Sequence, residues 1–297
     1  MTTPLILCLD GSTDVCSTAL VTSRAAGGPV APWEVVSRRQ HHDGRAHARV
    51  LLDLIDQMLR EIGEQPGALS VVVVGTGPGT FTGVRLTVAT ARALALALSI
   101  PVAGVSTLAA LAASVAAPDP EAALIVPVVD ARRGQVFYGL YARAANADAE
   151  LPWTRVGPFA VCDRDELSKR ILHEKGPIIA GPGGGFSALL VAEDASLVPC
   201  LAAGITLAMH DVRAEFLVQG QERLVEPGAL PEGDRLGAWL LGKGSAAVNA
   251  DAFSGPGGEG GGVGTPESVK PIYVRPPDAD IHITKMRDPW GTKAMDS

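Results

Sequence analysis

The sequence predicts an α/β fold with two similar halves, and two kinds of pattern support this. An apolar strand, a short turn that begins with aspartate and contains glycine, and a returning strand follow one another at residues 5–21 and again at 124–141. A continuous apolar run at residues 71–74, typical of a strand buried on both faces of a sheet, leads through a glycine-rich loop into a helix. The repeated hairpin indicates a duplication, with two unrelated hairpins as the alternative.

The composition limits both the core and the partners. The chain of 297 residues is 47% hydrophobic but only 4% aromatic, so its core must be filled by small aliphatic side chains, and pockets lined by aromatic rings are disfavoured. The net charge is −7, although the first 100 residues are neutral, with eight arginines and eight acidic residues. An acidic chain has the wrong sign to hold tRNA or DNA by itself through the phosphates.

The first hairpin consists of a strand at Leu5–Leu9, a polar turn at residues 10–14 and a returning strand at Cys16–Val21. The apolar run before Asp10 is too short for the apolar core of a signal peptide, so we expect a cytoplasmic protein. A helix is then predicted at residues 46–62. Its apolar positions cover an arc of about 200°, whereas one core needs about half of that. The excess predicts a second apolar neighbour, either another helix of this chain or another protein.

The strand Val71–Val74 leads through a loop at residues 75–83 into a helix predicted at Val84–Leu98. This helix is apolar almost all round, and only Arg85 and Arg92 mark a polar stripe on it. The two arginines and the following Pro101 interrupt the apolar stretch, so we do not expect it to cross a membrane.

The second half begins with strands at Leu124–Val129 and Gln135–Tyr141, joined by a turn at residues 130–134. Its further elements are predicted as a helix at Asp163–His173, a strand at Pro177–Ala180, a glycine cluster at 181–185 and a helix at 229–241. We expect the chain to divide into a first α/β lobe at 1–105, a second α/β lobe at 106–243, a glycine-rich linker or loop at 244–266, and a partly mobile C-terminal segment at 267–297.

The glycine-rich loop is a candidate anion site, because a strand, a glycine turn and a helix N-terminus together present backbone N–H groups to an anion. Close packing of the strand against the helix explains the glycines equally well. Asp10 and Asp130 end matching strands, but Arg132 and Arg133 stand where glycines would let the backbone wrap a phosphate. The candidate anion-binding residues are Asp10, Gly77, Gly79, Thr80, Arg132 and Arg133.

No catalytic or metal-ligating pattern stands out in the sequence. The six histidines form no HExxH motif, the four cysteines form no CxxC pair, and no serine lies in a GxSxG elbow. The residues therefore give no support to hydrolase chemistry, and we expect no metal site in this chain.

Several motifs in order along almost the whole chain resemble the TsaB (YeaZ) family. They are Leu9-Asp10, Arg45-Ala-His47 before a leucine-rich helix, Gly75-Thr-Gly-Pro-Gly-Thr-Phe-Thr-Gly-Val-Arg85, Pro101-Val-Ala-Gly-Val-Ser-Thr-Leu108, Asp130-Ala-Arg-Arg-Gly-Gln-Val136 and Pro271-Ile-Tyr-Val-Arg275. The glycine-rich block and the Asp-Ala-Arg-Arg block are specific only together. The glycine-rich insertion at 244–266 and the long tail depart from the family pattern.

The resemblance implies a duplicated actin/Hsp70-like (ASKHA, RNase H-like) fold and a noncatalytic subunit that binds and activates TsaD, which transfers the threonylcarbamoyl group to adenosine at tRNA position 37. It also implies a TsaE-type ATPase as a further partner, a homodimer as a further candidate assembly, and ATP or ADP only in the partner complex. We expect no direct tRNA binding and no membrane contact. The candidate partner-interface residues are Leu52, Leu59, Arg85 and Arg92.

Two other functions remain open on the sequence. The turn after the first strand and the glycine loops would also suit a stand-alone ATPase or sugar kinase of the same fold. The apolar first lobe would also suit a self-associating structural protein.

Overall fold

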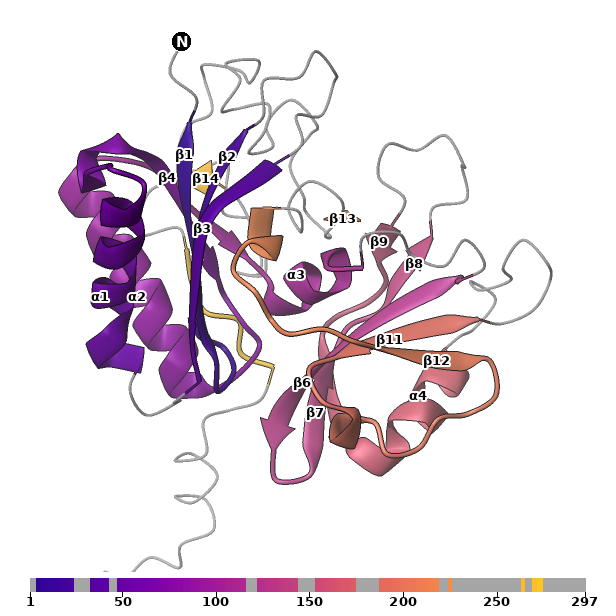
Figure 1. Ribbon diagram of the computed structural model, residues 1–297. Helices are drawn as coiled ribbons and strands as arrows, with labels where there is room; N and C mark the ends of the chain where they lie inside the picture. The colour runs from indigo at the N-terminus through magenta and orange to yellow at the C-terminus, as the bar shows by residue number, and fades with distance from the viewer. Residues whose placement is uncertain are drawn as a thin grey trace, which may run out of the picture.

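The computed structural model contains two sheets with helices on their outer sides and the helix α3 (Thr107–Ala113) between them (Figure 1). The structure describes residues 4–23, 33–42, 47–115, 122–143, 153–174, 187–218, 224–225, 263–264 and 269–274. Four predicted features lie outside these residues: the strand at 177–180, the glycine cluster at 181–185, the helix at 229–241 and the tail beyond residue 285.

The first sheet, sheet A, has the strand order β14-β5-β4-β1-β2-β3. Its strands are β1 (Leu5–Asp10), β2 (Cys16–Ser23), β3 (Trp33–His41), β4 (Leu69–Gly75), β5 (Val102–Val105) and β14 (Val263–Gly264). β1 and β2 form the predicted antiparallel hairpin, in which Leu7 lies opposite Leu20. On its other side β1 pairs in parallel with β4, with Leu7 beside Val72. The three strands predicted in this lobe are confirmed.

Two helices lie side by side on the outer face of sheet A, α1 (His47–Glu61) and α2 (Phe81–Leu98) (Figure 1). Leu51, Ile55 and Met58 of α1 pack in one buried cluster with Val84 and Val88 of α2. The leucines and valines of sheet A that point to the same side complete this cluster. The second apolar neighbour that the wide arc of α1 predicts is therefore, in part, the helix α2.

The helix α2 begins at Phe81, three residues before the predicted start, because the last residues of the glycine loop already form its first turn. Among the described helices, α2 is long and apolar enough to cross a membrane. A core helix of a globular protein meets the same criteria, and α2 buries Val84, Val88 and Ala95 in the cluster on sheet A.

The second sheet, sheet B, has eight strands in the described part of the chain. They are β6 (Leu124–Arg132), β7 (Gln135–Tyr138), β8 (Tyr141–Arg143), β9 (Trp153–Arg155), β10 (Ala160–Asp163), β11 (Ala188–Ala192), β12 (Ile205–Met209) and β13 (Leu224–Val225). β6 pairs antiparallel with β7 and β8 and in parallel with β11. The helix α4 (Leu167–Glu174), preceded by the 3₁₀ turn η2 (Arg164–Glu166), covers the outer face and replaces the single helix predicted there.

The strand predicted at residues 135–141 is two strands, which is a correction. β7 ends at Tyr138 and β8 begins at Tyr141, so the strand is interrupted at residues 139–140. Both parts pair with β6 in the same register, and the backbone N–H of Gly139 donates to the Pro127 carbonyl at 3.4 Å. A β-carbon at Gly139 would lie 3.0 Å from the ring of Phe159, which packs against the backbone at this position. A glycine within a strand pattern can mark a place where another group packs closely on the backbone, and Gly139 is such a place.

The helix α3 forms the centre of the molecule. All seven of its residues are buried, and the six from Leu108 to Ala113 share one cluster with Ile6 and Val73 from sheet A and with Ile125 and Val191 from sheet B. Four of the seven are alanines, so the two sheets approach the helix closely. The composition predicts a core of small aliphatic side chains, and the core around α3 is built in this way.

The C-terminal segment at residues 269–274 lies against the first lobe. Ile272 donates its backbone N–H to the carbonyl oxygen of Thr76 at 2.7 Å, and Val269 is buried in the cluster on the outer side of sheet A. Of the glycine-rich segment at 244–266, the structure describes only Val263–Gly264, which pair antiparallel with β5.

Candidate functional site

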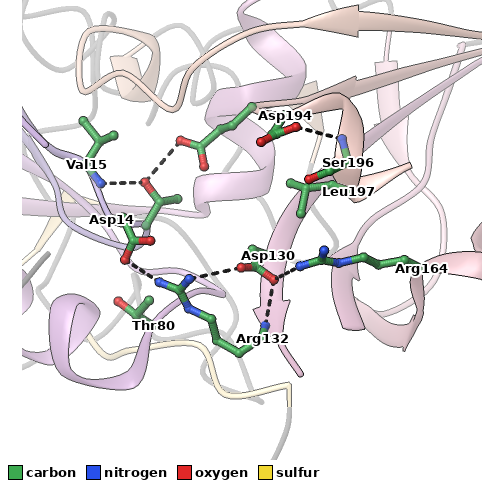
Figure 2. Close-up of a pocket in the computed structure, with 11 residues that line it drawn as sticks. Asp14, Val15, Thr80, Asp130, Arg132, Arg164, Asp194, Ser196 and Leu197 are labelled. Atoms are coloured by element: carbon green, nitrogen blue, oxygen red, sulfur yellow. Dashed lines mark hydrogen bonds and ion pairs between the residues drawn. The ribbon is translucent and has the colours of Figure 1, made fainter. Parts of the chain in front are cut away.

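A cavity of about 210 Å³ opens between the turns of the two sheets (Figure 2). It is lined by Thr13, Asp14, Val15, Thr80, Asp130, Arg132, Arg164, Glu193, Asp194, Ser196 and Leu197. These residues come from the turn after β1, the start of α2, the end of β6, η2 and the segment after β11. The cavity therefore lies where the ends of matching strands of the two sheets face each other.

Arg132 lies across this cavity and joins the two lobes. Its guanidinium contacts the carboxylate of Asp14 in the first lobe and donates to Asp130 Oδ2 at 3.2 Å (Figure 2). Arg164 donates to the other oxygen of Asp130 at 2.8 Å. The hydrogen bond to Asp14, followed by the charges of Asp14 and Asp130, raises the pKa of Arg132, so its side chain stays cationic.

The backbone of this turn is in the left-handed region. Arg132 and Arg133 have φ of 65° and 57°, and Gly134 has 77°. The backbone N–H of Arg132 donates to Asp130 Oδ1 at 2.9 Å. The turn therefore binds the side chain of its own aspartate, where a phosphate-binding turn would leave its N–H groups to the ligand.

Glu193 also lines the cavity. Its Oε1 accepts hydrogen bonds from Thr13 Oγ1 at 3.1 Å and from the backbone N–H of Val212 at 3.2 Å. Burial raises the pKa of Glu193 to about 7, the two hydrogen bonds oppose this rise, and the charges of Asp10 and Asp211 add to it. Sequence reasoning missed this residue, because it follows a strand, β11, that was not predicted.

Asp10 is buried and does not line the cavity. Its Oδ1 accepts from the backbone N–H and the hydroxyl of Ser12, at 2.8 and 2.6 Å, and its Oδ2 accepts from Thr107 Oγ1 at 3.0 Å. A β-carbon at Gly75 would lie 1.9 Å from this Oδ2. The carboxylate thus fastens the turn after β1 to the first residue of α3.

Close packing accounts for the glycines of the loop at 75–83. A β-carbon at Gly79 would lie 2.2 Å from the carbonyl oxygen of Ser12, and one at Gly83 would lie 2.0 Å from that of Gly11. Thr80 also donates its backbone N–H to the Ser12 carbonyl at 2.6 Å. The loop is therefore packed against the turn after β1, which favours the packing explanation over the anion site.

Of the candidate anion-binding residues, Thr80 and Arg132 line the cavity together, whereas Asp10, Gly77, Gly79 and Arg133 do not. The carbonyl of Gly77 accepts from the backbone N–H of Thr107 at 2.8 Å, so this residue holds α3. The residues that the sequence predicts as one anion site therefore do not form a single site. Thr80 and Arg132 line the cavity between the lobes, whereas Gly77 and Gly79 belong to the packed loop at residues 75–83.

The candidate interface residues also differ from one another. Leu52 of α1 is 56% exposed, Arg85 is exposed and Arg92 is half-buried. Leu59 is only 2% exposed and packs in the cluster between α1, α2 and sheet A. Its side chain cannot contact a partner, so the expectation for Leu59 is wrong. The face has a further apolar residue that was missed, Leu96 of α2, which is 69% exposed.

No cluster of three or more His, Cys, Asp or Glu side chains that could hold a metal ion occurs among the described residues. Burial raises the pKa of Cys16 to about 12, and it raises that of Cys8 as well, so both thiols stay protonated and are poor nucleophiles.

The two sheets, each built around an antiparallel hairpin with a further parallel strand, and the helix packed between them define the duplicated actin/Hsp70-like, or RNase H-like, class of α/β folds. Within this class the chain is similar in structure to YeaZ from Pseudomonas aeruginosa, with 24% identity, a TM-score of 0.57, and coverage of 91% of this chain and 99% of YeaZ.

A second solved structure, of an uncharacterized Pseudomonas aeruginosa protein with similarity to the peptidase YeaZ, is 23% identical, with a TM-score of 0.60, and covers 92% of this chain and 100% of its own. A sequence model of the TsaD family, described as tRNA N6-adenosine threonylcarbamoyltransferase, matches residues 35–151. No curated protein matches the sequence. The two structures show that the chain shares the fold of YeaZ, and the TsaD family model matches less than half of the chain.

Proposed function

We propose that this chain is a noncatalytic TsaB-type subunit that binds and activates a TsaD-type threonylcarbamoyltransferase in the modification of tRNA adenosine 37. The observation that carries the proposal is the outer helical face of the first lobe, formed by α1 and α2, on which Leu52 and Leu96 are 56% and 69% exposed. Large apolar side chains at the surface of neighbouring helices are typical of a protein interface. The resemblance to the TsaB (YeaZ) family implies the class of partner, and the likeness to YeaZ and the partial match to the TsaD family model support that resemblance.

The cavity between the lobes supports the noncatalytic part of the proposal. The cationic side chain of Arg132 lies between Asp14 and Asp130, and the N–H of its turn is bound to Asp130. A nucleotide phosphate at this turn would have to displace these contacts. A stand-alone ATPase or sugar kinase, the alternative function, is therefore less well supported. In the proposed complex the TsaD-type partner binds the tRNA, and ATP or ADP binds only when the partner is present. A TsaE-type ATPase is a further partner, and the complex is cytoplasmic.

The test is the affinity for the TsaD-type subunit of the same organism. We expect Leu52→Asp and Leu96→Asp to abolish co-purification, since each places a charge in an apolar interface. Met209→Asp is the matched control, because Met209 is 60% exposed but lies on β12 of the other lobe. All three variants should keep the circular dichroism spectrum of the parent protein.

If both charged variants of the outer helical face bind the TsaD-type subunit as tightly as the parent protein does, this face is not the interface. If the parent protein itself fails to bind, and its depletion leaves the threonylcarbamoyl modification of tRNA unchanged, the proposed function is wrong. Tight binding of Mg-ATP with turnover that Arg132 variants alter would instead favour the ATPase.

A further inference from the structure

Three side chains from distant parts of the sequence form a cluster at the start of α2. Phe81 and Arg85 lie one turn apart on this helix, and Tyr273 belongs to the C-terminal segment. The Cζ atom of Arg85 lies 3.7 Å from the centroid of the Phe81 ring and 5.6 Å from that of Tyr273. The two ring centroids are 5.5 Å apart. The guanidinium is thus stacked on one ring and flanked by the other.

The cluster holds Arg85 in one orientation. Its Nε donates a hydrogen bond to the hydroxyl of Tyr273 at 2.7 Å, while the ring of Phe81 covers one face of the guanidinium. Tyr273 is itself held in place, because the preceding Ile272 is buried and its N–H donates to the Thr76 carbonyl. A long flexible side chain therefore loses most of its freedom before any partner arrives.

The edge of the Arg85 guanidinium that carries its two terminal nitrogens is open to a partner. With Nε used by Tyr273, the two terminal nitrogens of Arg85 have no hydrogen-bond acceptor among the described residues, and no described carboxylate forms an ion pair with it. Phe81, Arg85 and Tyr273 are all exposed. A planar guanidinium with two parallel N–H donors matches a carboxylate in a bidentate pair.

Charge and position select the ligand. Arg85 is a fixed cation on the helix that also exposes the apolar Leu96, so a partner that covers both residues would either supply a counter-charge to Arg85 or desolvate it unpaired. A carboxylate on the covering surface meets this need, and the aromatic rings on either side would shield the pair from water.

We propose that Phe81, Arg85 and Tyr273 form a preformed receptor for one carboxylate side chain of the TsaD-type subunit, at the edge of the interface on α1 and α2. This inference rests on the proposed function and adds the chemistry of one contact to it. It also gives the C-terminal segment a role, because Tyr273 is what fixes the orientation of Arg85.

The experiment measures the dissociation constant of the full-length chain and the purified TsaD-type subunit of the same organism, at low and high salt. Arg85→Ala should weaken binding roughly 10- to 100-fold, the range for a hydrogen bond to a charged group. Arg85→Glu should weaken it further. Arg85→Lys should recover only part of the loss, because the ammonium cannot form the bidentate pair. Tyr273→Phe removes only the hydroxyl and should weaken binding less than Arg85→Ala does.

The matched control is Arg170→Ala, which removes an exposed arginine from α4 of the other lobe. It should bind like the parent protein. Increasing salt should weaken the parent complex more than the Arg85→Ala complex, since only the parent retains the ion pair.

Three results would overturn the inference. Equal affinity of Arg85→Ala and the parent protein would do so while leaving the proposed function intact. A lower unfolding temperature for Arg85→Ala with unchanged affinity would show that the cluster only fastens the C-terminal segment. Loss of self-association in Arg85→Glu, with binding to the TsaD-type subunit unchanged, would assign the cluster to a second copy of this chain. No binding by the parent protein would instead refute the proposed function.

Discussion

Replacement of Glu193 by glutamine should change how the stability of the protein depends on pH. The pKa of Glu193 is raised from 4.5 to about 7 in the folded protein, chiefly by burial. Between these two values the folded state binds a proton that the unfolded state releases, so the free energy of unfolding falls as the pH rises from 4.5 to 7. The stabilisation is fully present below pH 4.5 and lost above about pH 8.

The size of this effect follows from the difference in pKa. Each pH unit between the two values corresponds to about 1.4 kcal/mol, which gives at most about 3 kcal/mol for the whole window. Glutamine has the same shape and keeps an oxygen that can accept from Thr13 and Val212, but it carries no charge. Glu193→Gln should therefore be more stable than the parent protein at pH 8, and most of this advantage should be gone at pH 5.

The assay is urea unfolding followed by circular dichroism at pH 5, 6, 7 and 8, with the difference between variant and parent plotted against pH. Glu166→Gln is the control, since Glu166 is an exposed glutamate of η2 in the same lobe, and its curve should follow the parent. A difference between Glu193→Gln and the parent that stays constant from pH 5 to pH 8, or that decreases as the pH rises, would refute the reasoning.

Two further substitutions test the packing of the first lobe by the same urea assay. Gly79→Ala should destabilise the protein by at least about 2 kcal/mol, because the new β-carbon would lie 2.2 Å from the Ser12 carbonyl. Gly67→Ala is the control and should change the stability little, since no atom lies within 4 Å of its β-carbon. Similar losses of stability for the two variants would contradict the close approach at Gly79. Leu59→Ala should lower the free energy of unfolding by about 2–5 kcal/mol and Leu52→Ala by less than about 0.5 kcal/mol, since only Leu59 is buried. A large loss of stability in Leu52→Ala would show that Leu52 is not exposed.

The sequence was sufficient for the elements whose apolar pattern is strong. The two hairpins, the buried strand β4 and the helices α1 and α2 follow from runs and arcs of apolar residues, because these bury a continuous surface within one short segment. The edge strand β3 was missed, since it carries Glu34, Arg38 and Arg39 among its nine residues. An edge strand exposes much of its surface and tolerates such charges, so its pairing with β2 decides its conformation.

The candidate sites were harder to predict than the fold because they join residues that are distant in sequence. Nothing near Arg85 indicates that Tyr273, 188 residues later, accepts its hydrogen bond. Nothing near Asp14 indicates that Arg132 contacts it from the other lobe. The glycines of the loop were visible in the sequence, but their purpose depends on the backbone of Ser12, whose position follows only from the pairing of β1 with β4.

The cavity and the outer helical face share one element, the helix α2. Thr80, which precedes its first turn, lines the cavity and donates to the Ser12 carbonyl, while Arg85 lies one turn beyond Phe81 on the outer side. The contacts of Asp14 with Arg132 and of Thr13 with Glu193 fasten the same turn to the second lobe. Because a surface that is already fixed loses less conformational freedom on binding, we expect the contacts inside the cavity to favour the proposed binding at a face that they do not touch.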